Sequence, residues 1–395
     1  MLTLLQRYMN FSSRLLSWYY RHGRDLPWRA SRNPYHVWVS EVILQQTRME
    51  QGLIYFDRFV RAFPDVHALA AAPEDHVLRL WQGLGYYSRA RNLHHAARQI
   101  VDDMNGRLPE TGKEWSKLRG VGPYTAGAIA SIAFNEAVPA LDGNTVRVLA
   151  RLFAIEESMD VVKGKTIFDE LARSLLPEDR PGDFNQALMD FGSMVCRPAN
   201  PLCAECIFRG SCKAFRAKAV NRFPVRKAKM PPKDRYFNYF FFYLVHPGGD
   251  VVFFVRQRTG NDIWRGMYEL PLLETEWEMT ENDVLAHEWW ASFAGQGIDG
   301  VFTGRPFSMK QLLTHQRIHA RFFGVRVNNK DNDLLSKHFM RVNKETFEGL
   351  AKPRLLERFF RQHMPRYSDQ AESGTGADQK TRSSSSKSNR SAKKS

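Results

Sequence analysis

The feature that most constrains the fold is a glycine-rich turn, Leu118-Arg119-Gly120-Val121-Gly122-Pro123, which runs directly into an apolar segment typical of a helix. Gly120 and Gly122 leave backbone N–H groups unshielded by side chains, and the N-terminus of the following helix favours negative charge. Such a turn suits a phosphate of DNA. The same pattern also fits an ordinary turn between two helices, so residues further along the chain have to decide.

An aspartate follows the apolar helix, in Leu141-Asp142-Gly143-Asn144. The turn and this aspartate together resemble the helix-hairpin-helix, glycine/proline-rich loop and aspartate signature of the base-excision DNA glycosylases, over about residues 25–212. The resemblance implies that Gly120, Val121 and Gly122 contact DNA. Helical periodicity runs through residues 25–215 without a convincing strand, which favours an all-α domain. The resemblance implies that this domain, residues 1–215, is of the helix-hairpin-helix type.

The chain has four cysteines within one short segment, with six, two and five residues between them: Cys196, Cys203, Cys206 and Cys212. In a reducing compartment such clustering favours a metal centre over disulfides. The spacing lacks the paired knuckles of common zinc sites, although zinc remains an alternative. It resembles the [4Fe–4S] cluster loop of the endonuclease III and MutY families. Because Arg197, Arg209 and Lys213 lie beside these cysteines, we expect the cluster to be a scaffold that presents positive charge to phosphate.

Composition points to a large anionic partner. The 395 residues allow two domains and tails, and the net charge is +15 with a pI near 9.7. No apolar run approaches the roughly 18 residues of a membrane span, so duplex DNA is favoured over a membrane. A soluble basic protein without a nucleic-acid role has the same composition. Residues 1–20 are predicted to form an amphipathic helix rather than a signal peptide, and we expect a monomeric, cytoplasmic protein, bacterial and nucleoid-associated.

The pattern changes after residue 215. Residues 216–235 are basic and contain three prolines, a composition typical of a linker. Two strands are predicted at residues 236–246 and 251–256, joined by a hairpin at Pro247-Gly248-Gly249-Asp250. We therefore expect an α+β second domain over residues 236–366. Residues 367–395 are predicted to be a disordered basic tail, for which weak DNA affinity and solubility are both suitable roles.

The second domain resembles the Nudix-like C-terminal domain of the MutY family at Trp264-Arg265-Gly266-Met267-Tyr268-Glu269-Leu270-Pro271. An acidic Nudix box is missing from the sequence, so pyrophosphate hydrolysis is not expected. MutY proteins carry a Phe-Ser-His hairpin that contacts 8-oxoguanine, and the nearest match is Leu313-Thr314-His315. The resemblance implies that Thr314 and His315 read the base opposite the target.

Cleavage of a purine N-glycosidic bond needs a proton on the leaving base and a negative charge near the cationic sugar. Glu41 lies in an apolar helix, where desolvation raises its pKa and keeps a proton available, although an isolated glutamate here also fits a helix surface. The segment Trp38–Thr47 resembles the MutY motif around its catalytic glutamate. Asp142 would be the ionised partner while also capping the next helix, and Asn144 would orient a carboxylate or the attacking water.

Tyr124 distinguishes two branches of the superfamily. Bifunctional glycosylases place a lysine at this point of the hairpin, where it forms a Schiff base and cleaves the strand. Tyr124 stands there instead, so the resemblance implies a monofunctional enzyme. A core tyrosine is the plainer interpretation of the residue, and another lysine with lyase activity is still possible.

Further residues match MutY positions that handle the flipped base and its partner strand. Gln46 and Tyr86 match the residues that fill the vacated stack. Arg89 and Arg91, beside Tyr86, are candidates for phosphate contacts, and a turn of buried aromatics is the alternative interpretation. The resemblance assigns the substrate pocket to three other residues, Arg24, Arg29 and Gln186, the last at a position where some family members have glutamate.

These observations predict a two-domain adenine glycosylase that excises adenine opposite 8-oxoguanine or guanine. Two alternatives stay open. One is a thymine or other mismatch glycosylase on the same scaffold, and the other is a catalytically inactive protein that scans duplex DNA. The presence of both candidate carboxylates, Glu41 and Asp142, argues against the catalytically inactive protein.

Overall fold

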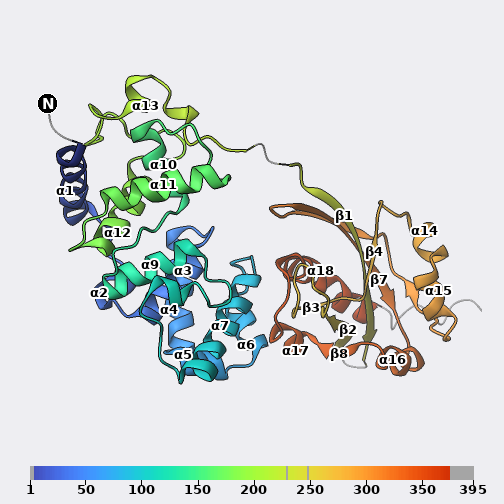
Figure 1. Cartoon of the computed structure of the whole chain (residues 1–395). Coiled ribbons are helices and arrows are strands. Elements are labelled where there is room, and N and C mark those ends of the chain that lie inside the picture. Colours follow the sequence, from blue (N-terminus) through green and yellow to red (C-terminus); the bar gives the residue numbers. More distant parts are fainter. Residues whose placement is uncertain (1–3, 228–229, 247–248, 374–395) are drawn as a thin grey trace, which may run out of the picture. The chain divides into compact units, whose positions relative to one another are not determined.

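The computed structural model describes residues 4–227, 230–246 and 249–373, and the chain divides into two compact units, residues 1–230 and 231–395 (Figure 1). Unit 1 is helical, and its described residues contain no strand. Its elements are α1 (Leu4–His22), α2 (Pro27–Ser31), α3 (Pro34–Leu44), α4 (Met49–Ala62), α5 (Val66–Ala71), α6 (Glu74–Leu80), α7 (Ser88–Met104), α8 (Gly112–Trp115), α9 (Pro123–Phe134), α10 (Gly143–Phe153), α11 (Val162–Leu175), α12 (Pro181–Met194), α13 (Lys213–Arg216) and the 3₁₀ turn η1 (Val220–Arg222).

Local sequence signals fix where the helices of the site begin. Asn33 accepts hydrogen bonds from the backbone N–H groups of Tyr35 and His36, and Pro34 opens α3 with a suitable φ. Asp142 caps α10 in the same way through the N–H of Thr145. Two helices of the apolar core, α3 and α9, pack against each other, while α1 and α10–α13 share a second core with Phe184 and Phe208 at its centre. The candidate site lies where these two groups of helices meet, at α12.

Unit 2 is an α+β domain, as predicted. Its elements are β1 (Lys233–Val245), β2 (Val251–Gln257), β3 (Tyr268–Glu269), β4 (Leu272–Thr275), α14 (Glu281–Ala286), α15 (Glu288–Ala294), β5 (Val301–Phe302), β6 (Phe307–Leu312), β7 (Gln316–Arg326), α16 (Asn329–Leu335), β8 (Met340–Asn343), α17 (Lys344–Glu348) and α18 (Arg354–Ser373). Strand β1 pairs with β7 in parallel and with β2 and β4 antiparallel, so it lies at the centre of the sheet.

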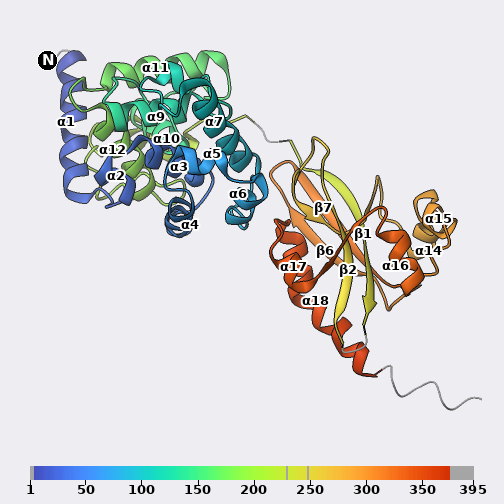
Figure 2. The same ribbon diagram turned by 90° about the horizontal axis from the view of Figure 1, so that it is seen from below.

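Helices cover both faces of the sheet in unit 2 (Figure 2). Because side chains alternate along β1, Phe240 stacks on Trp289 of α15 on one face, whereas Phe241 packs against Phe359 and Phe360 of α18 on the other. The predicted hairpin between β1 and β2 is present, with Tyr243 opposite Phe253. Its turn residues 247–248 lie outside the described residues.

The predicted linker, residues 216–235, is too long at both ends. Phe223 is buried in the core of unit 1, and the guanidinium of Arg151 donates to the carbonyls of Val220 and Phe223. At the other end β1 already begins at Lys233. Proline and positive charge suggested an unpacked segment, but carbonyl bonds and one buried ring anchor much of it to unit 1.

The predicted tail also begins too early, because α18 continues to Ser373. Gln370, Ala371 and Glu372 have good helix propensity and extend the helix beyond the boundary expected at residue 367. Residues 374–395 lie outside the described part of the chain. Within that part, no helix has the length and apolar character needed to cross a membrane.

Candidate active site

The glycine-rich turn connects α8 to α9. Gly120 has a φ of +78°, which L-residues rarely adopt, and a Cβ there would collide with Asn92. Gly122 is the residue before α9, and nothing lies within 4 Å of the point where its Cβ would be. Val121 is buried and anchors the turn. The backbone at the start of α9 is therefore open to close approach.

Glu41 of α3 is buried and meets Tyr124 of α9. The Tyr124 hydroxyl donates to Oε2 of Glu41 at 2.5 Å. Burial raises the pKa of Glu41 from 4.5 to about 7, the hydrogen bond from Tyr124 and the charge of Arg29 oppose this, and the carboxylate of Asp142 adds to it. Burial and the Glu41 charge also raise the pKa of Tyr124, which stays a neutral donor. The site thus holds a carboxyl group that carries a proton near neutral pH.

Asp142 is held at the start of α10 by two donors. Its Oδ1 accepts from the backbone of Thr145 at 2.7 Å, and its Oδ2 accepts from Nδ2 of Asn144 at 2.6 Å. The side-chain Oδ1 of Asn144 accepts in turn from the buried guanidinium of Arg147, which also donates to the backbone carbonyl of Cys196 at 2.7 Å. A continuous chain of hydrogen bonds therefore joins Asp142 to the first cysteine of the cysteine-rich segment.

The arginines predicted to line the substrate pocket are clamped by an acid that the sequence analysis missed. Asp190 of α12 has no exposed side-chain surface, and both Arg24 and Arg29 form ion pairs with it. Burial raises the pKa of Asp190, but the bonds and charges of the two arginines outweigh this and lower it. The clamp orients Arg29 close enough to Glu41 to act on its charge.

Replacement of Asp190 by asparagine is expected to destabilise the fold by on the order of 3 kcal/mol, because two largely buried guanidinium groups lose their counter-charge. Thermal or denaturant unfolding of unit 1 measures the change. Asp169→Asn is a matched control on α11, since its pair with Arg173 is about half exposed on both sides and is worth less than about 1 kcal/mol. Equal losses in the two variants would contradict the role given to burial.

Gln186 lies one turn before Asp190 on α12 and is buried. Its Nε2 donates to the carbonyl of Gly182 at 3.2 Å, while its Oε1 has no hydrogen-bond partner among the described residues. The buried Nε of Arg29 is likewise without one. Buried groups of this kind are normally paired, so the unpaired acceptor of Gln186 and the unpaired donor of Arg29, whose charge acts on Glu41, suit a polar ligand.

Two tight turns carry Gln46 and Tyr86. Both residues have positive φ angles, 59° and 48°, and Tyr86 is 43% exposed. Arg89 joins the turns: its guanidinium donates to the carbonyls of Val42 and Ile43 at the end of α3 and, at 3.3 Å, to Gly85. Burial lowers the pKa of Arg89 to about 10. Arg89 therefore holds these turns together, while its buried Nε has no hydrogen-bond partner among the described residues. Its predicted phosphate contact stays a prediction, as does that of Arg91, which is half-buried on α7.

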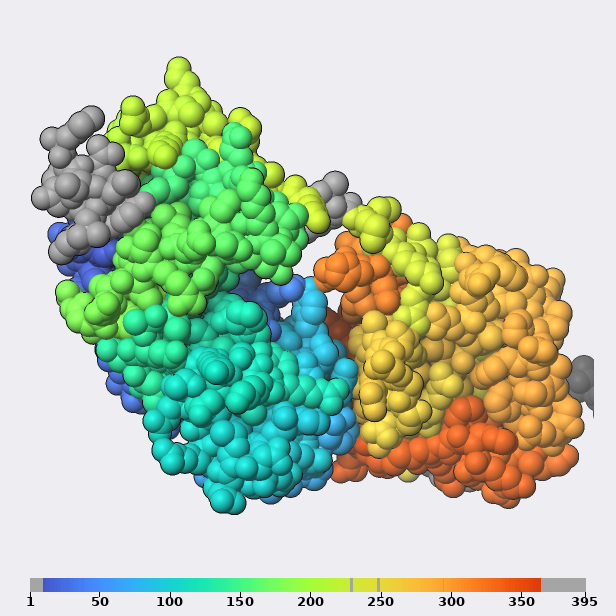
Figure 3. Space-filling model, in the orientation of Figure 1, coloured from blue at the N-terminus to red at the C-terminus, as the bar shows by residue number. Residues whose placement is uncertain are grey.

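The four cysteines line one cavity together with Arg151 and Arg209. No three His, Cys, Asp or Glu side chains in the described ranges come close enough to bind a single metal ion. Arg151 donates to the carbonyls of Cys196 and Arg197, and its Nη1 lies 3.5 Å from Sγ of Cys196. Four thiol donors around one cavity, with a buried cation beside them, fit a multinuclear cluster of negative charge. Figure 3 shows residues of this segment, in yellow-green, on the surface of unit 1.

In unit 2, Leu313-Thr314-His315 forms the turn between β6 and β7, with Thr314 and His315 exposed. The backbone closes it on both sides, because Leu313 donates to the carbonyl of Gln316 and Lys233 donates to that of His315. The structure thus presents both residues at the tip of a hairpin.

Comparison with known proteins matches this architecture. Residues 39–176 match the model of the HhH-GPD superfamily of base excision DNA repair proteins, and residues 240–362 match that of the NUDIX domain. The solved structure of a thermostable thymine-DNA glycosylase is 30% identical, with a TM-score of 0.50, and covers 53% of this chain and 97% of its own. The fold and site define a base-excision repair protein of the helix-hairpin-helix class with an appended Nudix-like unit.

Two relatives narrow the class. An adenine DNA glycosylase of Buchnera aphidicola subsp. Baizongia pistaciae is 34% identical over 70% of this chain and 76% of its own length. The adenine DNA glycosylase of Mus musculus is 44% identical over 52% of this chain but only 42% of its own, so the chain spans well under half of that relative. The chain belongs to the adenine DNA glycosylase family.

Proposed function

We propose that this chain is a monofunctional DNA glycosylase that removes adenine opposite 8-oxoguanine or guanine from duplex DNA. Glu41 donates a proton to a ring nitrogen of adenine, and the bond between N9 and C1′ breaks with its electron pair on the leaving base. Asp142 stabilises the positive charge on the sugar, and water adds its hydroxyl to C1′ while its proton passes to a carboxylate. Asn144 holds Asp142 in place.

The observation that supports this proposal best is the pair of Glu41 and Asp142. Glu41 has a pKa of about 7, so it is protonated in a large fraction of molecules at neutral pH, and Asp142 contributes to that raised pKa. Two coupled carboxyl groups in different environments are the equipment that acid-assisted glycosidic cleavage needs. The hydroxyl of Tyr124 positions Glu41 by donating a hydrogen bond to its carboxyl group. Tyr124 has no amine that could form a Schiff base.

A single-turnover assay tests the proposal. Three duplexes are compared, with A opposite 8-oxoguanine, A opposite G, and T opposite G. We expect base release from the first two, and an abasic strand that breaks only after alkali treatment. Release from the third duplex alone would favour a thymine glycosylase, the activity named for the matched solved structure. No release from any duplex would favour a DNA-scanning protein without catalysis.

The rate of adenine release is expected to fall about tenfold per pH unit above about pH 7, because Glu41 then loses its proton. The sign follows from the raised pKa, since the active form is protonated and disappears as pH rises through it. Single-turnover rates between about pH 6 and about pH 9 measure this. A flat profile over that range would contradict Glu41 as the proton donor.

We also propose that Cys196, Cys203, Cys206 and Cys212 bind a [4Fe–4S] cluster. The cluster fixes the loop whose exposed Arg209 and Lys213 present positive charge to the DNA backbone. Iron content and visible absorption of the purified chain test this assignment. The protein is proposed to act as a cytoplasmic monomer on nucleoid DNA, which sedimentation and localisation experiments address.

A further inference from the structure

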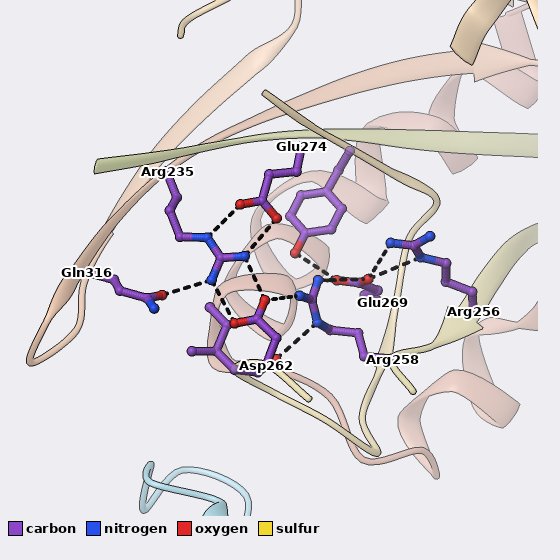
Figure 4. Close-up of polar contacts among 9 residues, drawn as sticks. Arg235, Arg256, Arg258, Asp262, Glu269, Glu274 and Gln316 are labelled. Carbon is purple, nitrogen blue, oxygen red and sulfur yellow. Dashed lines mark hydrogen bonds and ion pairs between the residues drawn. The ribbon is translucent and has the colours of Figure 1, made fainter. Parts of the chain in front are cut away.

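Arg235 of β1 lies at the centre of an ion-pair cluster in unit 2 (Figure 4). Its side chain is 12% exposed and binds two carboxylates, each through two hydrogen bonds, Glu274 at 2.6 and 2.7 Å and Asp262 at 2.6 and 2.9 Å. Nη1 of Arg235 also donates to Oε1 of Gln316 at 3.0 Å. These five bonds match the five N–H donors of a guanidinium, so its full capacity is used.

The partners of Arg235 come from three places in the chain. Glu274 is on β4, Asp262 is in the loop between β2 and β3, and Gln316 is the first residue of β7. Gln316 directly follows the exposed turn Leu313-Thr314-His315. The backbone bond from Lys233 to His315 joins the same turn to the start of β1. Arg235 therefore fixes the base of this turn against a second loop.

The second loop, residues 258–267, is itself held firmly. Arg258 donates to Asp262 at 2.8 Å and to both oxygens of the buried Glu269, at 3.0 and 2.9 Å. Burial lowers the pKa of the Arg235 guanidinium, but its bonds to Asp262 and Glu274 outweigh this and raise it. Burial raises the pKa of Asp262, and Arg235 outweighs that effect and lowers it. The pair of Arg235 and Asp262 is therefore favoured in its charged form, and it connects the two loops.

We propose that Arg235 is a positioning residue for the reading of the base opposite the excised adenine. It ties the turn Leu313-Thr314-His315 to loop 258–267, so that the two present one preorganised surface to the DNA. This inference rests on the proposed function, because it concerns how the partner base is recognised. Arg235 touches neither substrate nor reacting atoms, and it acts through Gln316.

Preorganisation explains why such an expensive cluster sits beside an exposed turn. A short turn with an exposed histidine loses conformational freedom when it binds, and a contact that fixes it beforehand lowers that cost. The guanidinium is suited to this because its planar donors fix three partners in one geometry. A lysine keeps the charge but offers three donors at a single point and cannot reproduce the bidentate bonds.

The test measures the ratio of adenine release rates from duplexes with A opposite 8-oxoguanine and A opposite G. Gln316→Ala removes only the fifth bond of Arg235 and is expected to lower this ratio about tenfold, with release from the A opposite G duplex unchanged. Arg235→Lys is expected to lower it similarly. Arg256→Gln is the matched control, since Arg256 contacts Glu269 in the same cluster but neither Asp262 nor Gln316, and should keep the wild-type ratio.

A double variant separates positioning from general loosening. If Gln316 acts through His315, then His315→Ala combined with Gln316→Ala lowers the ratio no further than His315→Ala alone. Additive losses, or a wild-type preference for 8-oxoguanine that Gln316→Ala retains, would overturn this inference while leaving the proposed function intact. A wild-type chain that releases no adenine from either duplex would overturn the proposed function and the inference with it.

Discussion

Replacement of Glu41 by glutamine is expected to slow single-turnover release of adenine opposite 8-oxoguanine by about 10³-fold and to leave duplex binding nearly unchanged. Glutamine has the shape of a protonated glutamate, and its carbonyl can still accept the hydroxyl of Tyr124, which is 2.5 Å from Oε2 in the wild type. It has no acidic proton to give to the leaving base. Rates from quenched single-turnover reactions and a binding titration with the same duplex measure the two effects.

The same substitution provides its own folding control. Burial raises the pKa of Glu41 from 4.5 to about 7. The stability that the fold gains from the protonated group is therefore complete below about pH 4.5 and is lost as pH rises through 7. At pH 8 the buried carboxylate is charged, which lowers the free energy of unfolding of the wild type. Glu41→Gln is therefore expected to be more stable at this pH by on the order of 2–3 kcal/mol. Loss of activity with gain of stability is the pattern expected when a catalytic acid is replaced. Replacement of a structural residue would lower both activity and stability.

Glu178→Gln supplies the matched control, because Glu178 is an exposed glutamate between α11 and α12. This variant should retain wild-type release and wild-type stability. Release by Glu41→Gln within about threefold of the wild type would remove Glu41 from the mechanism. The pH profile proposed above would then have to come from another group.

Local sequence patterns located the parts of the site that depend on neighbours in the chain. The glycine-rich turn, the capping position of Asp142 and the apolar surroundings of Glu41 all follow from a few consecutive residues. The pairing of Glu41 with Tyr124 links residues 83 positions apart, and nothing in either local segment specifies it. The resemblance to a family brought both residues into the candidate site, but the hydrogen bond between them is visible only in the fold.

Long-range ion pairs were the main omission. Asp190 looks like an ordinary polar residue of an amphipathic helix, yet it is buried because Arg24 and Arg29, more than 160 positions away, neutralise it. The structural contacts of Arg89 were missed for a related reason, since the carbonyls that it binds belong to the end of α3. Charge at a surface-like position predicts solvent or phosphate contact only when no buried partner competes for it.

The predicted linker was wrong for the same physical reason. Arg235 lies within a stretch whose proline and positive charge are typical of an unpacked segment. Its counter-charges, Asp262 and Glu274, follow 27 and 39 residues later, and with them the basic residue becomes part of the ordered start of the central strand β1. The strand further along β1 was easier to predict, because the unbroken burial of Phe237 to Tyr243 depends only on the two covered faces of the sheet.

Replacement of Asp142 by asparagine is expected to reduce adenine release by about 10²- to 10³-fold without loss of stability. Asparagine is as good a helix cap as aspartate, so the bond from the Thr145 N–H, at 2.7 Å, and the start of α10 are kept. The negative charge that would stabilise the cationic sugar is lost. Single-turnover rates measure the first effect and thermal unfolding the second.

The same variant probes the coupling between the two carboxyl groups. Because the charge of Asp142 contributes to the raised pKa of Glu41, its removal should move the upper limb of the pH profile to lower pH. Asp160→Asn is the control, since this exposed carboxylate accepts from Ser158 and lies outside the site. Unchanged release by Asp142→Asn, or loss of release that simply follows unfolding, would show that Asp142 acts only as a cap. A slow enzyme with an intact fold and a shifted profile would show that the capping aspartate also stabilises the sugar cation.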